Sequence, residues 1–96
     1  MSVELDHVTL NGAEKIFSAD DLYRLGLEAS TPGVGEETDL ITAHKWFNLA
    51  ALEGSEMAKE YRQQLTLEMT SREVAEAQRQ AREWLKKRRP VLAVVK

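Results

Sequence analysis

The sequence predicts an all-α domain of four helices, arranged as two stacked helical hairpins in an α/α superhelix. Apolar residues recur at three- and four-residue spacing in four segments, which is the period of an amphipathic helix. Capping residues, glycine or proline separate these segments, and no strong strand pattern lies between them. A chain of 96 residues has the length of one domain, so the four helices should share one modest core.

Composition narrows the classes of function. The chain is 43% hydrophobic and 30% charged, as folded soluble proteins are, and its net charge of −3 provides no overall basic field for nucleic acid. It has no cysteine, which excludes a disulfide framework and a thiolate metal site. We expect no metal and no cofactor.

The sequence carries no targeting or membrane signal. Residues 1–15 lack the basic and apolar regions of a secretory leader. The longest apolar run, VLAVV at 91–95, is far shorter than the ~20 residues of a membrane-spanning helix. We therefore expect a cytoplasmic protein.

The first helix should begin at Ser18, after an N-terminal arm of residues 1–17. Ser18 can accept hydrogen bonds from free backbone N–H groups, and Asp20 and Asp21 suit the positive end of a helix. Pro32 and the two glycines after it predict a loop at 30–38. The expected buried stripe of this helix is Leu22, Leu25, Gly26 and Ala29.

The second and third helices should follow one another almost without a loop. The second should start at Thr38 or Asp39 and end at Gly54, which can adopt a left-handed backbone, and Ser55 can cap the third at once. Their expected buried residues are Leu40, Ala43, Trp46, Phe47, Ala50 and Ala51 in the second helix, and Met57, Ala58, Tyr61, Leu65 and Met69 in the third.

The fourth helix has the clearest start signal. T-S-R-E at 70–73 matches a capping box, in which Thr70 accepts from the amide three residues on and Glu73 reaches back. Pro90 should end the helix before a C-terminal tail of residues 90–96. The expected buried residues are Val74, Ala77, Gln78, Ala81, Trp84 and Leu85.

A shift of 38 residues places the third and fourth helices on the first and second. Helix pairs that repeat at about this length are typical of a solenoid. We therefore divide a repeat domain of residues 18–89 into a first hairpin at 18–54 and a degenerate second hairpin at 55–89. The matching pairs are Tyr23 with Tyr61, Arg24 with Arg62, Leu27 with Leu65, Ala43 with Ala81, and Trp46 with Trp84.

Small and large side chains should have different roles in the packing of the helices. Alanines should let the helices of a hairpin approach closely, while Trp46, Phe47 and Trp84 should fill the wedge between one hairpin and the next. The alanines are Ala43, Ala50 and Ala51.

The first unit resembles the Sel1-like repeat, a relative of the tetratricopeptide repeat. The resemblance covers roughly residues 19–55 and is most specific in AHKWFNLAALEGS at 43–55. Ala29 stands where the family has a tyrosine, and the glycine loop is one residue longer. The matching positions are Leu25, Gly26, Gly33, Val34, Asp39, Ala43, Trp46, Phe47, Ala50, Ala51 and Gly54.

The resemblance implies a small bacterial protein built as an α/α superhelix and acting as an adaptor in protein complexes, without enzymatic activity. In such a stack the first helix of each pair lines the concave face, where we expect a protein or peptide partner. Tyrosine and arginine are frequent at protein-binding hot spots. The candidate binding residues are Tyr23, Arg24, Glu28, Tyr61 and Arg62. The alternative is that both tyrosines are half-buried core residues covered by the arginines.

The end of the fourth helix suggests an alternative function. Six of the 13 cations gather there, as in a factor that associates with nucleic acid or another anionic surface. A solvated helix end favoured by the macrodipole explains them without a partner, so we do not expect nucleic acid as the main partner. The residues are Arg79, Arg82, Lys86, Lys87, Arg88 and Arg89.

The two histidines, His7 and His44, suggest no active site. Phe47 and Asn48, one turn after His44, are poor metal ligands, so we expect a surface or interhelical role for His44 and no catalytic residue. Residues 1–17 and the VLAVV tail can cover the open ends of the stack, so we expect a monomer rather than a homodimer.

Overall fold

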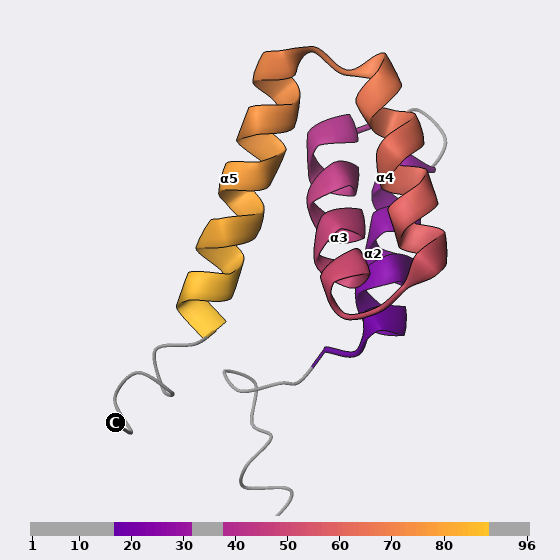
Figure 1. Ribbon diagram of the computed structural model, residues 1–96, viewed down its shortest axis with the longest axis vertical. Helices are drawn as coiled ribbons and strands as arrows, with labels where there is room; N and C mark the ends of the chain where they lie inside the picture. The colour runs from indigo at the N-terminus through magenta and orange to yellow at the C-terminus, as the bar shows by residue number, and fades with distance from the viewer. Residues whose placement is uncertain (1–16, 32–37, 89–96) are drawn as a thin grey trace, which may run out of the picture.

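The computed structural model describes residues 17–31 and 38–88, which form four α-helices and no strand (Figure 1). The helices are α2 (Ala19–Ser30), α3 (Leu40–Leu52), α4 (Glu56–Glu68) and α5 (Ser71–Arg88). The prediction of an all-α, four-helix domain is confirmed. Predictions for residues 1–16, the glycine loop at 32–37 and residues 89–96 lie outside the described residues.

Side chains at the predicted positions cap the helices. Ser18 Oγ accepts from the Asp21 amide at 3.1 Å, and the Asp21 carboxylate accepts from the Ser18 amide at 3.0 Å, so α2 begins with a reciprocal capping box. Thr70 and Glu73 form the predicted box at α5, with distances of 3.1 and 2.9 Å.

Asp39 and Ser55 cap the two middle helices. Asp39 Oδ1 accepts from the Thr42 amide at 3.0 Å, and Ser55 Oγ accepts from the Ala58 amide at 3.1 Å. Each bond satisfies a backbone donor that the first turn of a helix leaves free.

Gly54 reverses the chain between α3 and α4. Its φ is +108°, a conformation that favours glycine. The Gly54 amide donates to the Ala51 carbonyl and the Ser55 amide to the Ala50 carbonyl, both at 3.0 Å, which is the Schellman pattern. Because Ser55 also caps α4, the turn needs no further residue.

Helices α4 and α5 do not pack on each other as α2 and α3 do. Each of the three other helices packs against α3 (Figure 1). Contact between α2 and α4 is slight, and α4 and α5 make little direct contact. The second pair therefore diverges around α3, whereas α2 and α3 form a close antiparallel pair. Accordingly, α3 buries residues on several sides, while α4 buries only Ala58 and α5 only Ala77 and Ala81.

Alanines provide the close approaches, as predicted. Phe47 is also fully buried, and Leu25 and Ala51 are partly buried against the core. The alanines exposed by 2% or less are Ala43, Ala50, Ala58, Ala77 and Ala81.

Three assignments from the sequence are wrong. Met57 and Gln78, which were predicted to be buried, are exposed, Met57 by 53%. Leu49 lies off the predicted stripe of α3 and yet is 1% exposed. A single amphipathic stripe assumes one covering neighbour, but α3 has three.

The two indoles pack between α3 and α5. Trp46 of α3 and Trp84 of α5 meet edge to face with ring centroids 5.7 Å apart, and both are partly buried. Phe17, at the end of the N-terminal arm, meets Trp84 at 5.6 Å. The indoles thus join α5 to the first hairpin.

Candidate interaction surfaces

Two tyrosines lie side by side on α2 and α4. The ring centroids of Tyr23 and Tyr61 are 6.0 Å apart, and Tyr61 stacks on Phe47 at 5.3 Å. Both tyrosines are partly buried, so each ring is held by the core on one side and reaches solvent on the other. With Arg24 and Glu28 they form what we term the tyrosine surface.

The five predicted binding residues are only partly brought together. Arg24 and Glu28 are exposed on α2, and Arg24 lies 3.5 Å from the Asp20 carboxylate. Arg62 instead faces α3, where its Nη1 donates to Asn48 Oδ1 at 2.7 Å. The structure therefore leaves both interpretations of the tyrosines open, as binding residues or as core residues. The two rings are half-buried, as a core role requires, but Arg24 and Arg62 do not both cover them.

Tyr23 keeps its phenolic proton at neutral pH. Burial raises the pKa of Tyr23, and the charge and hydrogen bond of Tyr61 and the charge of Asp20 raise it further. A phenol in this position offers a partner both a hydrogen-bond donor and an acceptor.

His44 joins α3 to α4 and is 2% exposed. Its Nε2 lies 3.1 Å from Thr66 Oγ1, and that hydroxyl donates to the Arg62 carbonyl at 2.8 Å. The hydroxyl proton is thus engaged, so His44 is the donor and its Nδ1 carries no proton. That buried Nδ1 has no hydrogen-bond partner among the described residues.

His44 is therefore a neutral interhelical residue, one of the two roles expected from the sequence. Burial lowers the pKa of His44, and the positive charge of Arg62 lowers it further. An imidazolium here would be desolvated and would leave a buried N–H unsatisfied.

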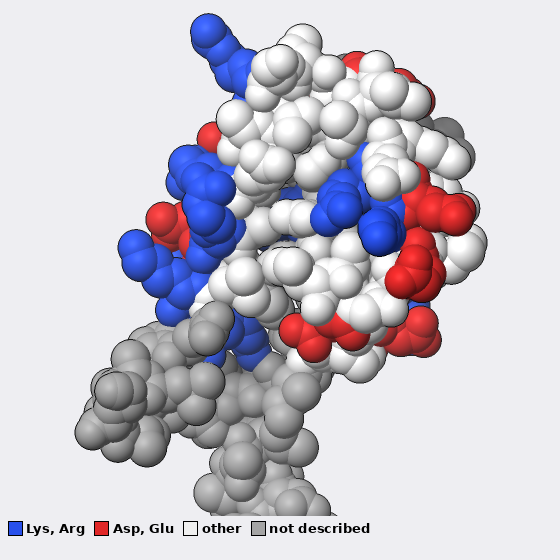
Figure 2. Space-filling view, viewed as in Figure 1, with Lys and Arg blue, Asp and Glu red and all other residues white. Residues whose placement is uncertain are grey.

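Charge is divided between α5 and the other helices. Helix α5 holds six Lys or Arg and three Glu, while the other described residues hold four Lys or Arg and eight Asp or Glu. Figure 2 shows one group of cations along the α5 side of one face, and a second group across that face beside most of its acidic residues. Five of the six cations of α5 lie between Arg79 and Arg88, at the basic end predicted from the sequence, and we term this part of α5 the basic flank.

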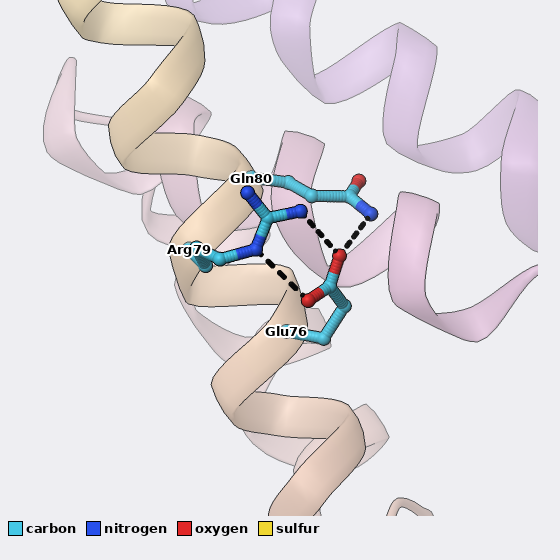
Figure 3. A network of polar contacts seen from close by, with 3 residues as sticks. All are labelled: Glu76, Arg79 and Gln80. Atoms are coloured by element: carbon cyan, nitrogen blue, oxygen red, sulfur yellow. Dashed lines mark hydrogen bonds and ion pairs between the residues drawn. The ribbon is translucent and has the colours of Figure 1, made fainter.

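One cation of this flank is already neutralised. Arg79 Nε and Nη2 donate to the two oxygens of Glu76 at 3.0 and 2.7 Å, and Gln80 donates to the same carboxylate at 2.9 Å (Figure 3). These bonds lower the pKa of Glu76 to about 2, the side-chain bond from Arg79 contributing most.

A crevice of about 320 Å³ lies between α3 and α5. Its lining comprises Lys45, Arg79, Gln80, Glu83, Trp84 and Lys87. The Lys45 ammonium lies 4.3 Å from the centroid of the Trp46 ring. Sequence reasoning missed Lys45, because only the packing of α5 on α3 brings it to the basic flank.

Lys45 is partly desolvated. Burial lowers its pKa, Asp39 partly offsets this, and Lys87 lowers it further. Lys45 and Lys87 therefore bring two positive charges to the same crevice.

Other kinds of site find no support in the described part of the chain. Residues 17–31 and 38–88 contain no group of three His, Asp or Glu side chains placed to hold a metal ion. Among these same residues, no helix is long and apolar enough to cross a membrane.

Comparisons with protein-family models, with curated proteins and with solved structures found no match to this chain.

Proposed function

We propose that this protein is a non-enzymatic protein-interaction module, a small Sel1-like adaptor of the bacterial cytoplasm. It binds its partner through the tyrosine surface, on the side of the superhelix lined by α2 and α4. The observation that carries the proposal is the pair of half-exposed rings, Tyr23 and Tyr61, with centroids 6.0 Å apart.

The pair has the properties of a binding hot spot. Phe47 lies beneath both rings, at 6.0 Å from Tyr23 and 5.3 Å from Tyr61, so neither ring loses much conformational freedom on binding. Arg24 and Glu28 place exposed charges of both signs beside the rings. A peptide with an apolar anchor and polar flanks suits such a surface.

The stacked arrangement of the two repeats is part of the same proposal. Trp46 and Trp84 occupy equivalent positions in the 38-residue repeat and contact one another. Helices α3 and α5, the second helices of the two pairs, run in the same direction and pack together (Figure 1). These contacts support a superhelix whose second hairpin is opened.

Site-specific photo-crosslinking tests the binding surface. A photoreactive amino acid in place of Glu28 should crosslink a partner in the native host, and Arg24→Ala should weaken that crosslink. The matched control places the same group at Arg72, which is exposed on α5. Crosslinking of the same partner with equal yield from both positions, or none from Glu28, would refute the tyrosine surface.

A further inference from the structure

We propose that the crevice between α3 and α5 binds a carboxylate side chain of an acidic partner segment, held between Lys45 and Lys87 against Trp84. This second surface is independent of the tyrosine surface. Lys45 comes from α3, and Lys87 and Trp84 come from α5, so the site exists only where the two helices pack.

The first argument is that the two lysines of the crevice have no ion-pair partner among residues 17–31 and 38–88. The only ion pairs among the described residues are Arg24 with Asp20 and Arg79 with Glu76. Arg79 is therefore satisfied, while neither lysine of the crevice is paired with a described carboxylate. A carboxylate placed between the two ammonium groups would relieve their repulsion and form charge-assisted hydrogen bonds.

The second argument is shape and polarity. Lys45 is half-buried with its ammonium over Trp46, so its position is constrained before a partner arrives. Trp84 adds an apolar wall on which the methylene groups of a glutamate can pack. The crevice thus offers both a charge and an apolar contact to one acidic side chain.

The third argument favours a protein partner over nucleic acid. Glu83 lines the crevice and Glu76 lies beside it, and these carboxylates act on a phosphate and on a partner carboxylate alike, so charge does not distinguish the two. Stacking does, because a nucleic-acid base would need a free aromatic face. At Trp84, however, Arg88 lies 5.0 Å from the ring centroid, and Phe17 and Trp46 pack on the ring.

The test uses the full chain and a fluorescein-labelled oligoglutamate peptide as the probe. Fluorescence anisotropy at low salt should show binding that weakens as salt is added. Because the chain is net negative, binding requires a local basic site. Trp84 lines this crevice and contacts Trp46, the other tryptophan of the chain, so the unlabelled peptide should also change the tryptophan emission.

Variants locate the site. Lys87→Gln should weaken binding about fivefold, the upper range for one exposed ion pair. Lys45→Met keeps the aliphatic stem over Trp46, and together with Lys87→Gln it should weaken binding about tenfold or more. The matched control is Lys59→Gln on the exposed side of α4, which should leave affinity unchanged. Circular dichroism melts verify that each variant folds.

The proposal fails if the peptide does not bind, if Lys59→Gln weakens binding as much as Lys87→Gln, or if single-stranded DNA of equal length binds as tightly. Photo-crosslinking from Glu28 should be unaffected in the Lys45→Met, Lys87→Gln variant. Failure of the carboxylate site therefore remains distinguishable from failure of the tyrosine surface.

Discussion

Gly26 of α2 lies directly against the ring of Phe47 of α3. A Cβ atom on Gly26 would lie 2.5 Å from Phe47 Cε1 and 2.6 Å from Cδ1, closer than side-chain atoms pack. Phe47 is fully buried and stacks on Tyr61, so its ring has little room to move away. This contact sets how closely the first helical pair packs.

Gly26→Ala should therefore destabilise the protein, although alanine is the better helix former. Overpacking of a buried ring costs about 1–3 kcal/mol, and the helix propensity gained returns up to about 1 kcal/mol. We expect a net loss of about 1 kcal/mol in the free energy of unfolding, measured by urea denaturation. Arg24→Ala, on the exposed side of the same helix, is the control. An unchanged or higher urea midpoint for Gly26→Ala would contradict the contact.

Gly54→Ala should destabilise the protein for a different reason. Nothing lies within 4 Å of a Cβ at Gly54, so the cost comes from its φ of +108° alone. A non-glycine residue with positive φ costs about 1–2 kcal/mol. Gly54→Asn should lose less than Gly54→Ala, because asparagine tolerates positive φ better. Equal stability of Gly54→Ala and the wild type in thermal unfolding would show that the turn relaxes.

His44 should make stability fall in mild acid. Its pKa is lowered in the folded state from the ordinary 6.5, so the unfolded chain binds the proton more readily. The stabilisation is complete above pH 6.5 and is lost as pH falls through the lower folded value. His44→Leu should reduce the difference in unfolding free energy between about pH 7.5 and 5.5, whereas His7→Gln should retain it. Equal pH dependence in His44→Leu and the wild type would refute this role.

Glu76 should make stability fall at a lower pH than His44 does. Its pKa is lowered from 4.5 to about 2 by the bonds from Arg79 and Gln80, so its stabilisation is present above pH 4.5 and lost as pH falls toward 2. Nuclear magnetic resonance titration of the Glu76 carboxyl in Arg79→Ala should show the pKa returning toward 4.5. A Glu76 pKa that stays near 2 in this variant would assign the shift to another group.

Trp46 and Trp84 should be energetically coupled. Their edge-to-face contact at 5.7 Å links α3 to α5, and such aromatic pairs contribute about 0.5–1.5 kcal/mol beyond burial. A double-mutant cycle with Trp46→Leu and Trp84→Leu should give a coupling energy in this range. Phe17→Leu combined with Trp46→Leu serves as a comparison, since each of these rings contacts Trp84. Strict additivity of Trp46→Leu and Trp84→Leu would contradict the coupling.

Local signals account for most of what was predicted. Ser18, Asp39, Ser55 and Thr70 act on amides three residues away, so their roles follow from short-range geometry. Of the candidate binding residues, Tyr23 and Tyr61 were identified through the repeat and do meet in space. The direction of Arg62 depends on Asn48 of another helix, and no spacing within α4 predicts it.

The amino-acid sequence by itself determined that residues 17–31 and 38–88 form four helices and where each described end lies, because capping and helical periodicity act within a few residues. It also supplied the small residues and the aromatic rings that let the helices pack. Only the tertiary structure decided that α3 is covered on three sides, that α4 and α5 diverge, and that Lys45 shares a crevice with Lys87. Those features depend on contacts between residues far apart in the chain, where packing and burial, rather than local backbone preference, select the arrangement.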